Sequence, residues 1–478
     1  MFCPLVKGFA ASGPDRTSIQ GTQGMAIKTL EDKIRAAGNP VDMLRNAAQG
    51  PYQFPIQSEF TNWRDEQEAW RHGAVLFDQS FHMTDLTVEG PDTRKLCENL
   101  AVNSMANWQR DMAKQFVHCT EDGYVVGDAI IFILEENKVN IVNKPSNRNW
   151  VVYHAETGGY DVNCTTDDRA LDNTGRRRGY RFEVQGPRAW TILEKLNGGP
   201  IEGFKFFRMG EITIAGRKVR ALRHGMAGAA GLELFGPFED YNLIRDAILE
   251  AGQGEGLRAA GAKTYSTVAH ESGWFPSPLP AIYGGEALRP YREWLPADGF
   301  EAGLSLGGSF VSDNVEDYYL TPYDIGYGHI VKLDHDFIGR DSLEAKQDAP
   351  HRHKVTLRWG KDDVVRVFAS MFNTGDRYKF LDMPASHYAT CPYDLVTKDG
   401  KPVGLSHYPV YTSNVSGWIS LALVDENVAT PGAEVSLTWG EPDGGSAKPS
   451  VERHVQTEIA CTVEPCPISV TARESYRT

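Results

Sequence analysis

Two polar residues lie at positions where their chemistry could be used. His82 closes the run D-Q-S-F-H-M (78–83), and an imidazole at such a junction between elements can exchange a proton near neutral pH. The alternative is a histidine satisfied by a backbone carbonyl. Asp128 interrupts the apolar run E-D-G-Y-V-V-G-D-A-I-I-F (121–132). A carboxylate among such neighbours is costly unless it is paired or its charge is used, and the alternative is a strand-edge aspartate facing solvent.

A second pair of segments offers groups for binding a ligand. Glu233 lies within G-L-E-L-F-G-P (231–237), where its carboxylate could accept hydrogen bonds from the N–H groups of a heterocycle. Tyr265 and Trp274 belong to T-Y-S-T-V-A-H-E-S-G-W-F-P-S-P-L-P (264–280). Aromatic residues on loops often contact ligands, although a lone tryptophan more often packs in a core.

Composition excludes several classes of function. The chain has 478 residues with 49 Lys+Arg and 63 Asp+Glu, a net charge of −14, and an acidic chain without a basic block is a poor nucleic-acid binder. No run approaches the length of a membrane span. The seven cysteines include no C-x-x-C pair and predict reduced thiols in the cytoplasm. No cluster of cysteines and histidines has zinc-ligand spacing, so no metal is expected.

The elements that must position these residues follow from the apolar patterns. Helices are expected at 61–76, with Thr61 as N-cap, and at 92–100, 149–157, 188–196 and 241–251, with two shorter ones in 26–46. Strands are expected at 84–88, 124–134, 138–142, 181–187, 211–215, 218–223 and 232–235. The basic triplet Arg176–Arg178 is predicted to be a solvated loop. Short alternating runs in 353–370 and 402–472 predict an all-β module of roughly 120 residues, either a sandwich or a small barrel.

Several motifs resemble those of the tetrahydrofolate-binding aminomethyltransferases, the T-protein of the glycine cleavage system, from about residue 27 to 475. They are V-N-I-V-N-K-P-S-N (139–147), F-E-V-Q-G-P (182–187), G-L-E-L-F (231–235) and Y-D-I-G-Y-G-H-I-V-K-L-D-H-D-F-I-G-R-D-S-L (323–343). Other runs resemble the bacterial tetrahydrofolate-dependent aromatic O-demethylases of the vanillate, syringate and 3-O-methylgallate class. These are the runs at 62–83, 224–233, 271–283 and 469–476.

The resemblance implies an α+β, three-lobed T-protein-like fold around a central folate channel. Residues 25–350 would form two interleaved α+β lobes, and residues 351–478 a β-barrel or sandwich lobe. Residues 1–24 are rich in Gly, Ser, Thr and Gln, and this composition predicts a flexible tail. The implied activity moves a methyl group from a methoxylated aromatic compound to N5 of tetrahydrofolate, giving 5-methyltetrahydrofolate and a phenol. Small molecules would be the only partners, with no obligatory protein partner, nucleic acid or membrane.

The resemblance also assigns residues to roles. Folate contacts would be Gln185, Glu233, Trp274, Val142 and Asn143, and substrate contacts would be Phe54, Gln79, Lys144 and Arg148. The chemistry of methyl transfer, rather than the resemblance, suggests Tyr265, His82 and Asp128 as catalytic residues. Tyr265 would donate a proton or hydrogen bond to the departing oxygen, His82 would orient the ring hydroxyl or share the proton, and Asp128 would face N5.

Two pocket positions depart from the pattern expected for vanillate-type relatives. Lys144 stands where we expect arginine, and Phe54 stands where we expect tyrosine. A lysine offers one point charge in place of a bidentate grip on a carboxylate, and Arg148 could compensate. The substrate could therefore be syringate, another methoxybenzoate or a neutral methoxyphenol.

Other activities on the same fold are an aminomethyltransferase working with a lipoyl carrier protein, and a demethylase of sulfonium or other methyl donors. A non-catalytic folate-binding assembly or repair factor is a further alternative. Such factors carry a K-G-C-x-x-G-Q-E type element, and the corresponding run here, D-F-I-G-R-D-S-L, has no cysteine.

Overall fold

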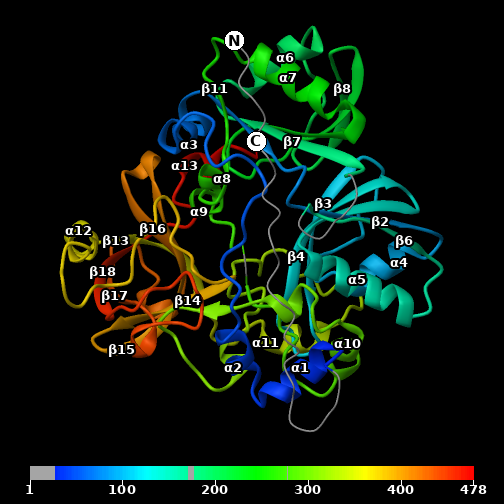
Figure 1. Ribbon diagram of the computed structural model, residues 1–478. Coiled ribbons are helices and arrows are strands. Elements are labelled where there is room, and N and C mark those ends of the chain that lie inside the picture. Colours follow the sequence, from blue (N-terminus) through cyan, green and yellow to red (C-terminus); the bar gives the residue numbers. More distant parts are fainter. Residues whose placement is uncertain (1–26, 171–176, 277, 478) are drawn as a thin grey trace, which may run out of the picture.

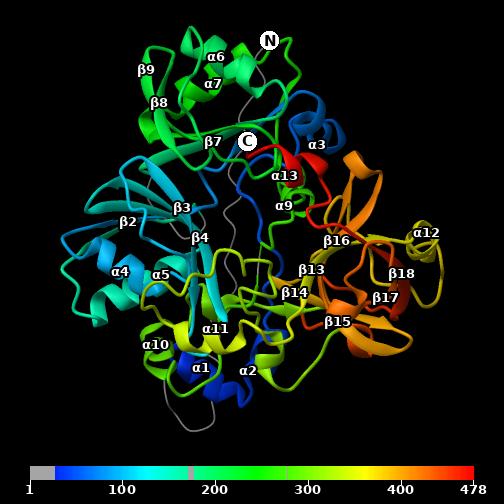
Figure 2. The same ribbon diagram turned by 180° about the vertical axis from the view of Figure 1, so that it is seen from behind.

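Three β-sheets form the framework of the chain, and each is the centre of one lobe (Figure 1). The computed structural model describes residues 27–170, 177–276 and 278–477, so the tail predicted at 1–24 lies outside the described residues. From behind, the lobes still surround a common centre, and α9 (Val268–Ser272) lies between the first lobe and the barrel (Figure 2). The expected three-lobed α+β fold is thus confirmed.

The first lobe is built on a six-stranded sheet with the order β11-β1-β7-β10-β9-β8. Its strands are antiparallel except for the parallel β1–β11 pair. They span β1 (Ala74–Asp78), β7 (Gly179–Gln185), β8 (Met209–Ile214), β9 (Arg217–Leu222), β10 (Gly231–Pro237) and β11 (Leu257–Ala259). The helices α6 (Ala189–Asn197) and α7 (Tyr241–Ala251) share a hydrophobic core with this sheet. Nearby are α3 (Trp63–His72) and α8 (Ala262–Tyr265).

The second lobe has a five-stranded antiparallel sheet with the order β3-β4-β5-β2-β6. Its strands are β2 (Thr84–Glu89), β3 (Met112–Cys119), β4 (Val125–Glu135), β5 (Lys138–Asn143) and β6 (Asn163–Asp167). One core joins this sheet to flanking helices. These are α1 (Leu30–Ala37), α2 (Pro40–Arg45), α4 (Thr93–Leu100), α5 (Pro145–Thr157), α10 (Arg289–Trp294) and α11 (Arg340–Lys346). The sheet therefore holds β4 and the start of α5 rigidly toward the centre.

The third lobe is a closed six-stranded barrel, because the β14–β17 pairing joins the ends of the series β14-β15-β16-β13-β18-β17. Its strands are β13 (His353–Trp359), β14 (Cys391–Lys398), β15 (Lys401–Thr412), β16 (Gly417–Val424), β17 (Glu434–Trp439) and β18 (Thr457–Glu464). The short β12 (Leu306–Gly307) adds to β14 from outside. The last helix, α13 (Val470–Glu474), returns toward the first lobe, where Tyr476 contacts Phe206.

The structure corrects two predicted elements. The helix expected at 61–76 begins at Trp63, because Asn62 rather than Thr61 caps it by accepting from Asp65 N. It ends at His72, and the apolar residues that follow form β1. In the β module, α12 (Lys361–Ser370) replaces the expected alternating strand, because its apolar residues recur at helical spacing.

The prediction of a solvated loop for the basic triplet is wrong at Arg177, which is buried, whereas Arg178 is exposed. The Arg177 side chain is 5% exposed and donates to the backbone oxygens of Met83, Asp167 and Asp168 at 2.8, 3.1 and 2.5 Å. It also donates to Asp85 Oδ2 at 2.9 Å. A run of three arginines gave no signal of this, since the partners come from distant strands.

Replacing Arg177 with methionine should destabilise the fold by about 3 kcal/mol. Asp85 then keeps only Arg181 as an ion-pair partner, and the carbonyl oxygens that Arg177 serves lose their donor. Chemical denaturation of the wild type and the variant measures this loss. Arg178→Met is the neighbouring control, because the Arg178 side chain is exposed. An equal loss in both variants would contradict the structural role of Arg177.

Across the residues that the structure describes, no helix is long and apolar enough to cross a membrane. The six cysteines in this part of the chain are free thiols.

Candidate functional site

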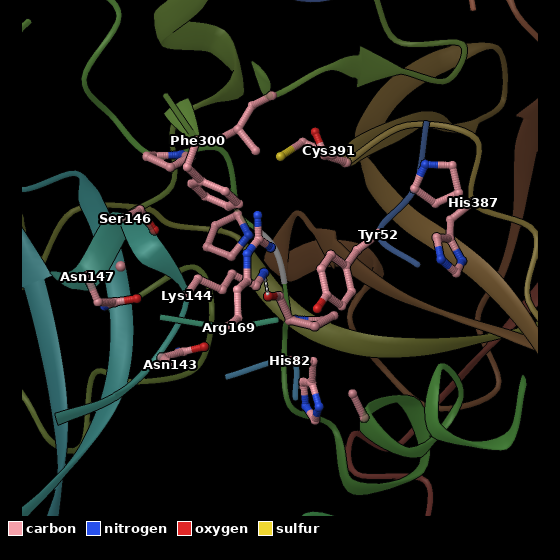
Figure 3. Close-up of a pocket in the computed structure, with 18 of the residues that line it drawn as sticks. Tyr52, His82, Asn143, Lys144, Ser146, Asn147, Arg169, Phe300, His387 and Cys391 are labelled. Carbon is pink, nitrogen blue, oxygen red and sulfur yellow. Dashed lines mark hydrogen bonds between the residues drawn. The ribbon is translucent and has the colours of Figure 1, made fainter. Parts of the chain in front are cut away.

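A cavity of about 570 Å³ opens where residues of all three lobes converge. Figure 3 shows its walls: Asn143, Lys144 and Asn147 on the side of the second sheet, and His387 and Cys391 on the side of the barrel. The sequence-predicted residues that line it are Phe54, His82, Asp128, Asn143, Lys144, Tyr265 and Trp274. All three predicted catalytic residues therefore reach one space, whose size suits a small ligand.

An aromatic cluster forms one wall. The ring of Tyr265, the last residue of α8, lies 4.6 Å from both the Phe54 and the His82 ring, and Phe54 lies 5.1 Å from His82. The Tyr265 hydroxyl lies 3.3 Å from Met226 Sδ. Burial, together with the charges of nearby carboxylates, raises the pKa of Tyr265 well above its usual value. The phenol therefore keeps its proton and can donate a hydrogen bond into the cavity.

His82 is a neutral imidazole. Burial, together with the charges of Arg177 and Arg169, lowers its pKa to about 3. Its Nε2 atom is buried and has no hydrogen-bond partner among the described residues. The loop between β1 and β2 thus presents a ring nitrogen that can exchange a hydrogen bond with a ligand but carries no charge at working pH.

Asp128 is the centre of a buried hydrogen-bond cluster. Its Oδ2 accepts from Trp274 Nε1 at 2.9 Å and from the Tyr327 hydroxyl at 2.5 Å, and its Oδ1 accepts from Gln115. Burial raises the pKa of Asp128, and these donors oppose that rise. Asn143, at the end of β5, donates to the backbone carbonyl of Asp128. The cluster holds a carboxylate at a fixed place in the wall.

Two cationic side chains also line the cavity. Lys144 is the N-cap residue of α5, and its Nζ donates to the carbonyl of Pro276. Burial lowers the pKa of Lys144 to about 8. Arg169, which follows β6, lies over the rings of Tyr52 and Phe300, with centroid distances of 5.0 and 4.9 Å. Figure 3 shows Lys144 and Arg169 close together in the cavity.

Three predicted ligand contacts belong to the first lobe and are not among the residues that line the cavity: Gln185 and Glu233 on β7 and β10, and Gln79 directly after β1. Gln185 accepts from Ala227 N at 2.8 Å, and Gln79 Nε2 donates to Glu183 Oε2 at 3.0 Å. Glu233 is the cross-strand partner of Glu183 and pairs with Arg181 at 2.5 Å.

These carboxylates form a buried acidic group with a histidine. Ligand atoms of Glu183, His224 and Glu233 lie within 4.8 Å of one another. Burial and the negative charge of Glu233 raise the pKa of Glu183 well above its usual value. Glu183 also accepts from Met226 N at 3.0 Å. This hydrogen bond holds the backbone of Met226, whose sulfur atom contacts the Tyr265 hydroxyl.

Two further predicted contacts do not line the cavity either. Arg148 pairs with Asp168 at 3.4 Å, and Val142 packs in a hydrophobic cluster with Phe132 and Met209. Conversely, sequence reasoning missed Arg169, Tyr327 and Glu183. Arg169 stands in a polar stretch that is typical of a surface loop. Glu183 alternates with apolar residues as Glu233 does, so the same argument about the cost of burying a carboxylate could have identified Glu183.

Comparisons with known proteins identify relatives over most of the chain. Residues 38–276 match the family model described as the GCVT N-terminal domain. The chain is 47% identical over 451 residues to a syringate O-demethylase of Sphingobium sp. (strain NBRC 103272 / SYK-6), covering 94% of this chain and 98% of that protein. It is 29% identical to a sesamin methylene transferase of Sinomonas sp. (strain No.22), covering 74% and 79%.

The fold is shared with a solved structure. The glycine cleavage system aminomethyltransferase T from Bartonella henselae superposes with a TM-score of 0.58 at 17% identity, covering 88% of this chain and 94% of that chain.

Proposed function

Because this chain belongs to the GCVT domain family, we propose that it is a tetrahydrofolate-dependent O-demethylase of methoxylated aromatic compounds. The observation that carries the proposal is the 47% identity to a syringate O-demethylase over 94% of the chain. Aminomethyltransferases among its relatives match at 26–28% over 81% of the chain. Its partners are small molecules. The six cysteines in the described part of the chain are free thiols, which supports a cytoplasmic location.

The reaction breaks the bond between the methyl carbon and the ether oxygen and forms a bond from that carbon to nitrogen. Tetrahydrofolate supplies the N5 amine, which accepts the methyl group and gives up its proton, while the departing oxygen gains one. Phenoxide is a poor leaving group, so the protein must align the reacting atoms and stabilise the departing oxygen with a proton donor.

Tyr265 is the residue that donates a hydrogen bond or a proton to the departing oxygen. Its phenol stays protonated, as its raised pKa requires, and it lies against His82 and Phe54 in the same wall. His82 is neutral, so it acts as a hydrogen-bond partner that orients a ring hydroxyl rather than as the acid. The aromatic wall packs against the substrate ring.

The residues present fit tetrahydrofolate. The aminopyrimidinone edge of a pterin carries N–H donors, and the carboxyl groups of Glu183 and Glu233 offer acceptors. Glu183 accepts from the backbone of Met226, which lines the cavity. His224 Nδ1 is buried and has no partner among the described residues. Asp128, held by Trp274 and Tyr327, would supply a negative charge to stabilise the positive charge that develops on the accepting amine. Asn143 donates to the backbone carbonyl of Asp128 in β4, and Trp274 adds an aromatic surface to the site.

The test is anaerobic incubation of the protein with tetrahydrofolate and a panel of vanillate, syringate, 3-O-methylgallate, guaiacol and veratrate. We expect equal amounts of 5-methyltetrahydrofolate and the demethylated phenol from at least one compound. Omitting tetrahydrofolate is the control and should abolish both products. If tetrahydrofolate binds but no aromatic compound is demethylated, the proposal fails and the aminomethyl or sulfonium substrates become the next to assay.

Lys144 predicts a pH dependence for carboxylated substrates. Its pKa of about 8 means that the ammonium is present below pH 8 and is lost above it, together with its attraction for an anion. We expect kcat/KM for syringate to fall as pH rises through about 8, because kcat/KM reports groups of the free enzyme. In Lys144→Arg the charge persists, so this fall should disappear, and its persistence in the variant would contradict the assignment to Lys144.

A further inference from the structure

Glu183 is a fully buried carboxyl group that does not line the cavity. It lies on β7 opposite Glu233, and it is Glu233 that pairs with Arg181 at 2.5 Å. Burying an acid is costly unless its oxygens are used. Both oxygens of Glu183 accept a hydrogen bond, Oε1 from Met226 N and Oε2 from Gln79 Nε2, each at 3.0 Å. The structure therefore uses this acid as an acceptor for two neutral donors.

The same two residues, Met226 and Gln79, contact the hydroxyl group of Tyr265. That hydroxyl donates to Met226 Sδ at 3.3 Å, and the Gln79 side chain is its second partner. Burial raises the pKa of Tyr265, and the hydrogen bond with Gln79 opposes that rise, which is the effect of a donor to the phenol oxygen. One carboxyl group thus holds both residues that contact this hydroxyl.

The hydrogen bonds around Tyr265 have a defined direction. The amide nitrogen of Gln79 carries two hydrogens, so it can donate to Glu183 and to the phenol oxygen at the same time. The phenol proton then points toward Met226 Sδ and the cavity that Met226 lines. If the Gln79 amide were turned over, its oxygen would accept that proton instead. Glu183 favours the observed orientation, because a carboxyl group keeps acceptor capacity whether or not it is protonated.

We propose that Glu183 is a positioning residue, which acts through Gln79 and Met226 to direct the proton of the Tyr265 hydroxyl toward the departing ether oxygen. Glu183 does this without touching the aromatic substrate. The inference rests on the proposed function, since it deepens the role of Tyr265 in that reaction. A contact between Glu183 and the pterin edge is a separate role, and the experiment distinguishes the two.

The test is a double-mutant cycle in single-turnover methyl transfer from syringate at saturating tetrahydrofolate. Glu183→Gln keeps the size of the side chain but places an NH₂ group against one of the two donors, so the Gln79 amide has to turn over or lose its partner. We expect the rate to fall about 10- to 100-fold, the usual result of misplacing a catalytic group. In the Tyr265→Phe protein, which has no hydroxyl to direct, Glu183→Gln should change the rate by less than about twofold.

A second cycle measures binding and needs no turnover. The probe is 3-O-methylgallate, the phenol that demethylation of syringate releases, and its Kd is measured by calorimetry without tetrahydrofolate. Tyr265→Phe and Glu183→Gln should each raise this Kd about 3- to 10-fold, the size of one hydrogen bond. The double variant should bind no more weakly than either single variant, because both substitutions remove the same interaction.

Two further variants complete the design. Glu239→Gln changes an exposed glutamate of the first lobe and should leave the rate and the Kd unchanged. Gln79→Met removes the amide while Glu183 stays, so it tests the same chain of contacts if Glu183→Gln fails to fold. Its effect should also disappear in the Tyr265→Phe protein. An equal fall in rate with and without the Tyr265 hydroxyl would overturn the proposal and assign Glu183 to the cofactor or to the fold.

The proposed function can fail separately from this inference. If the wild type does not demethylate syringate but the two substitutions are not additive in the binding cycle, only the reaction is wrong. If the wild type demethylates syringate and the effects of Glu183→Gln and Tyr265→Phe simply multiply, only the role of Glu183 is wrong.

Discussion

Replacing Tyr265 with phenylalanine will lower kcat for aryl ether demethylation by about 10²- to 10⁴-fold, the usual contribution of a positioned acid. The ring remains, so its packing on Phe54, Phe77 and His82 is kept, and only the hydroxyl is lost. The structure gives that hydroxyl proton a weak acceptor, Met226 Sδ at 3.3 Å, while the Gln79 side chain is a hydrogen-bond partner of the hydroxyl oxygen. A substrate oxygen is a better acceptor than a thioether, so the hydroxyl can turn to the substrate at little cost.

Single-turnover measurements under anaerobic conditions test this, because they separate methyl transfer from product release. We expect the Kd of the aromatic substrate to change by less than about tenfold, since a single neutral hydrogen bond contributes about 1 kcal/mol. Tyr160→Phe makes the same chemical change outside the cavity and should leave the rate unchanged. A Tyr265→Phe enzyme with normal turnover would remove Tyr265 from the mechanism.

Leaving groups of different acidity extend the same test. When the released phenol is a stronger acid, the departing oxygen needs less help from a hydrogen-bond donor. The rate loss in Tyr265→Phe should therefore shrink as electron-withdrawing substituents are added to the ring. A loss that stays constant across the series would indicate that Tyr265 positions the ring instead of stabilising the oxygen.

Local patterns in the sequence were sufficient to predict the residues whose burial is set by their own strand or loop. Asp128 stands among apolar neighbours in β4, and the cost of burying its charge marked it without any knowledge of its partners. The structure brings it to the cavity together with His82 and Tyr265. The family resemblance supplied Phe54, Lys144, Asn143 and the order of the lobes, which no periodicity reveals.

Partners that come from distant segments could not be predicted in this way. Tyr327 reaches Asp128 across 199 positions, and the aromatic contacts of Arg169 come from residues 52 and 300. In the sequence an arginine in a polar stretch is typical of a solvated surface. Arg177 was misjudged for the same reason, because its burial depends on Asp85 and on the carbonyl of Met83. Tertiary pairing of charged groups leaves no periodic signal.

Replacing Asp128 with asparagine should lower kcat by about 10²- to 10³-fold, the range seen when a preorganised electrostatic partner of the transition state is removed. The substitution is nearly isosteric. One amide oxygen can still accept from Trp274 and Tyr327, and the Gln115 amide, which donates to the other carboxylate oxygen, can turn over and accept instead. The network can therefore stay satisfied while its negative charge is lost, which makes the variant a test of charge rather than of packing.

The pH profile distinguishes loss of charge from loss of structure. Because burial raises the pKa of Asp128, the wild-type rate should decline on the acid side at a pH above the usual range for an aspartate. The carboxylate is charged above its pKa and neutral below it, so activity falls as pH falls. Asp128→Asn should lack this acid limb and keep the wild-type Kd for the aromatic substrate. An unchanged acid limb in the variant, or a large fall in melting temperature, would mean that Asp128 serves the fold and that another group supplies the charge at the accepting amine.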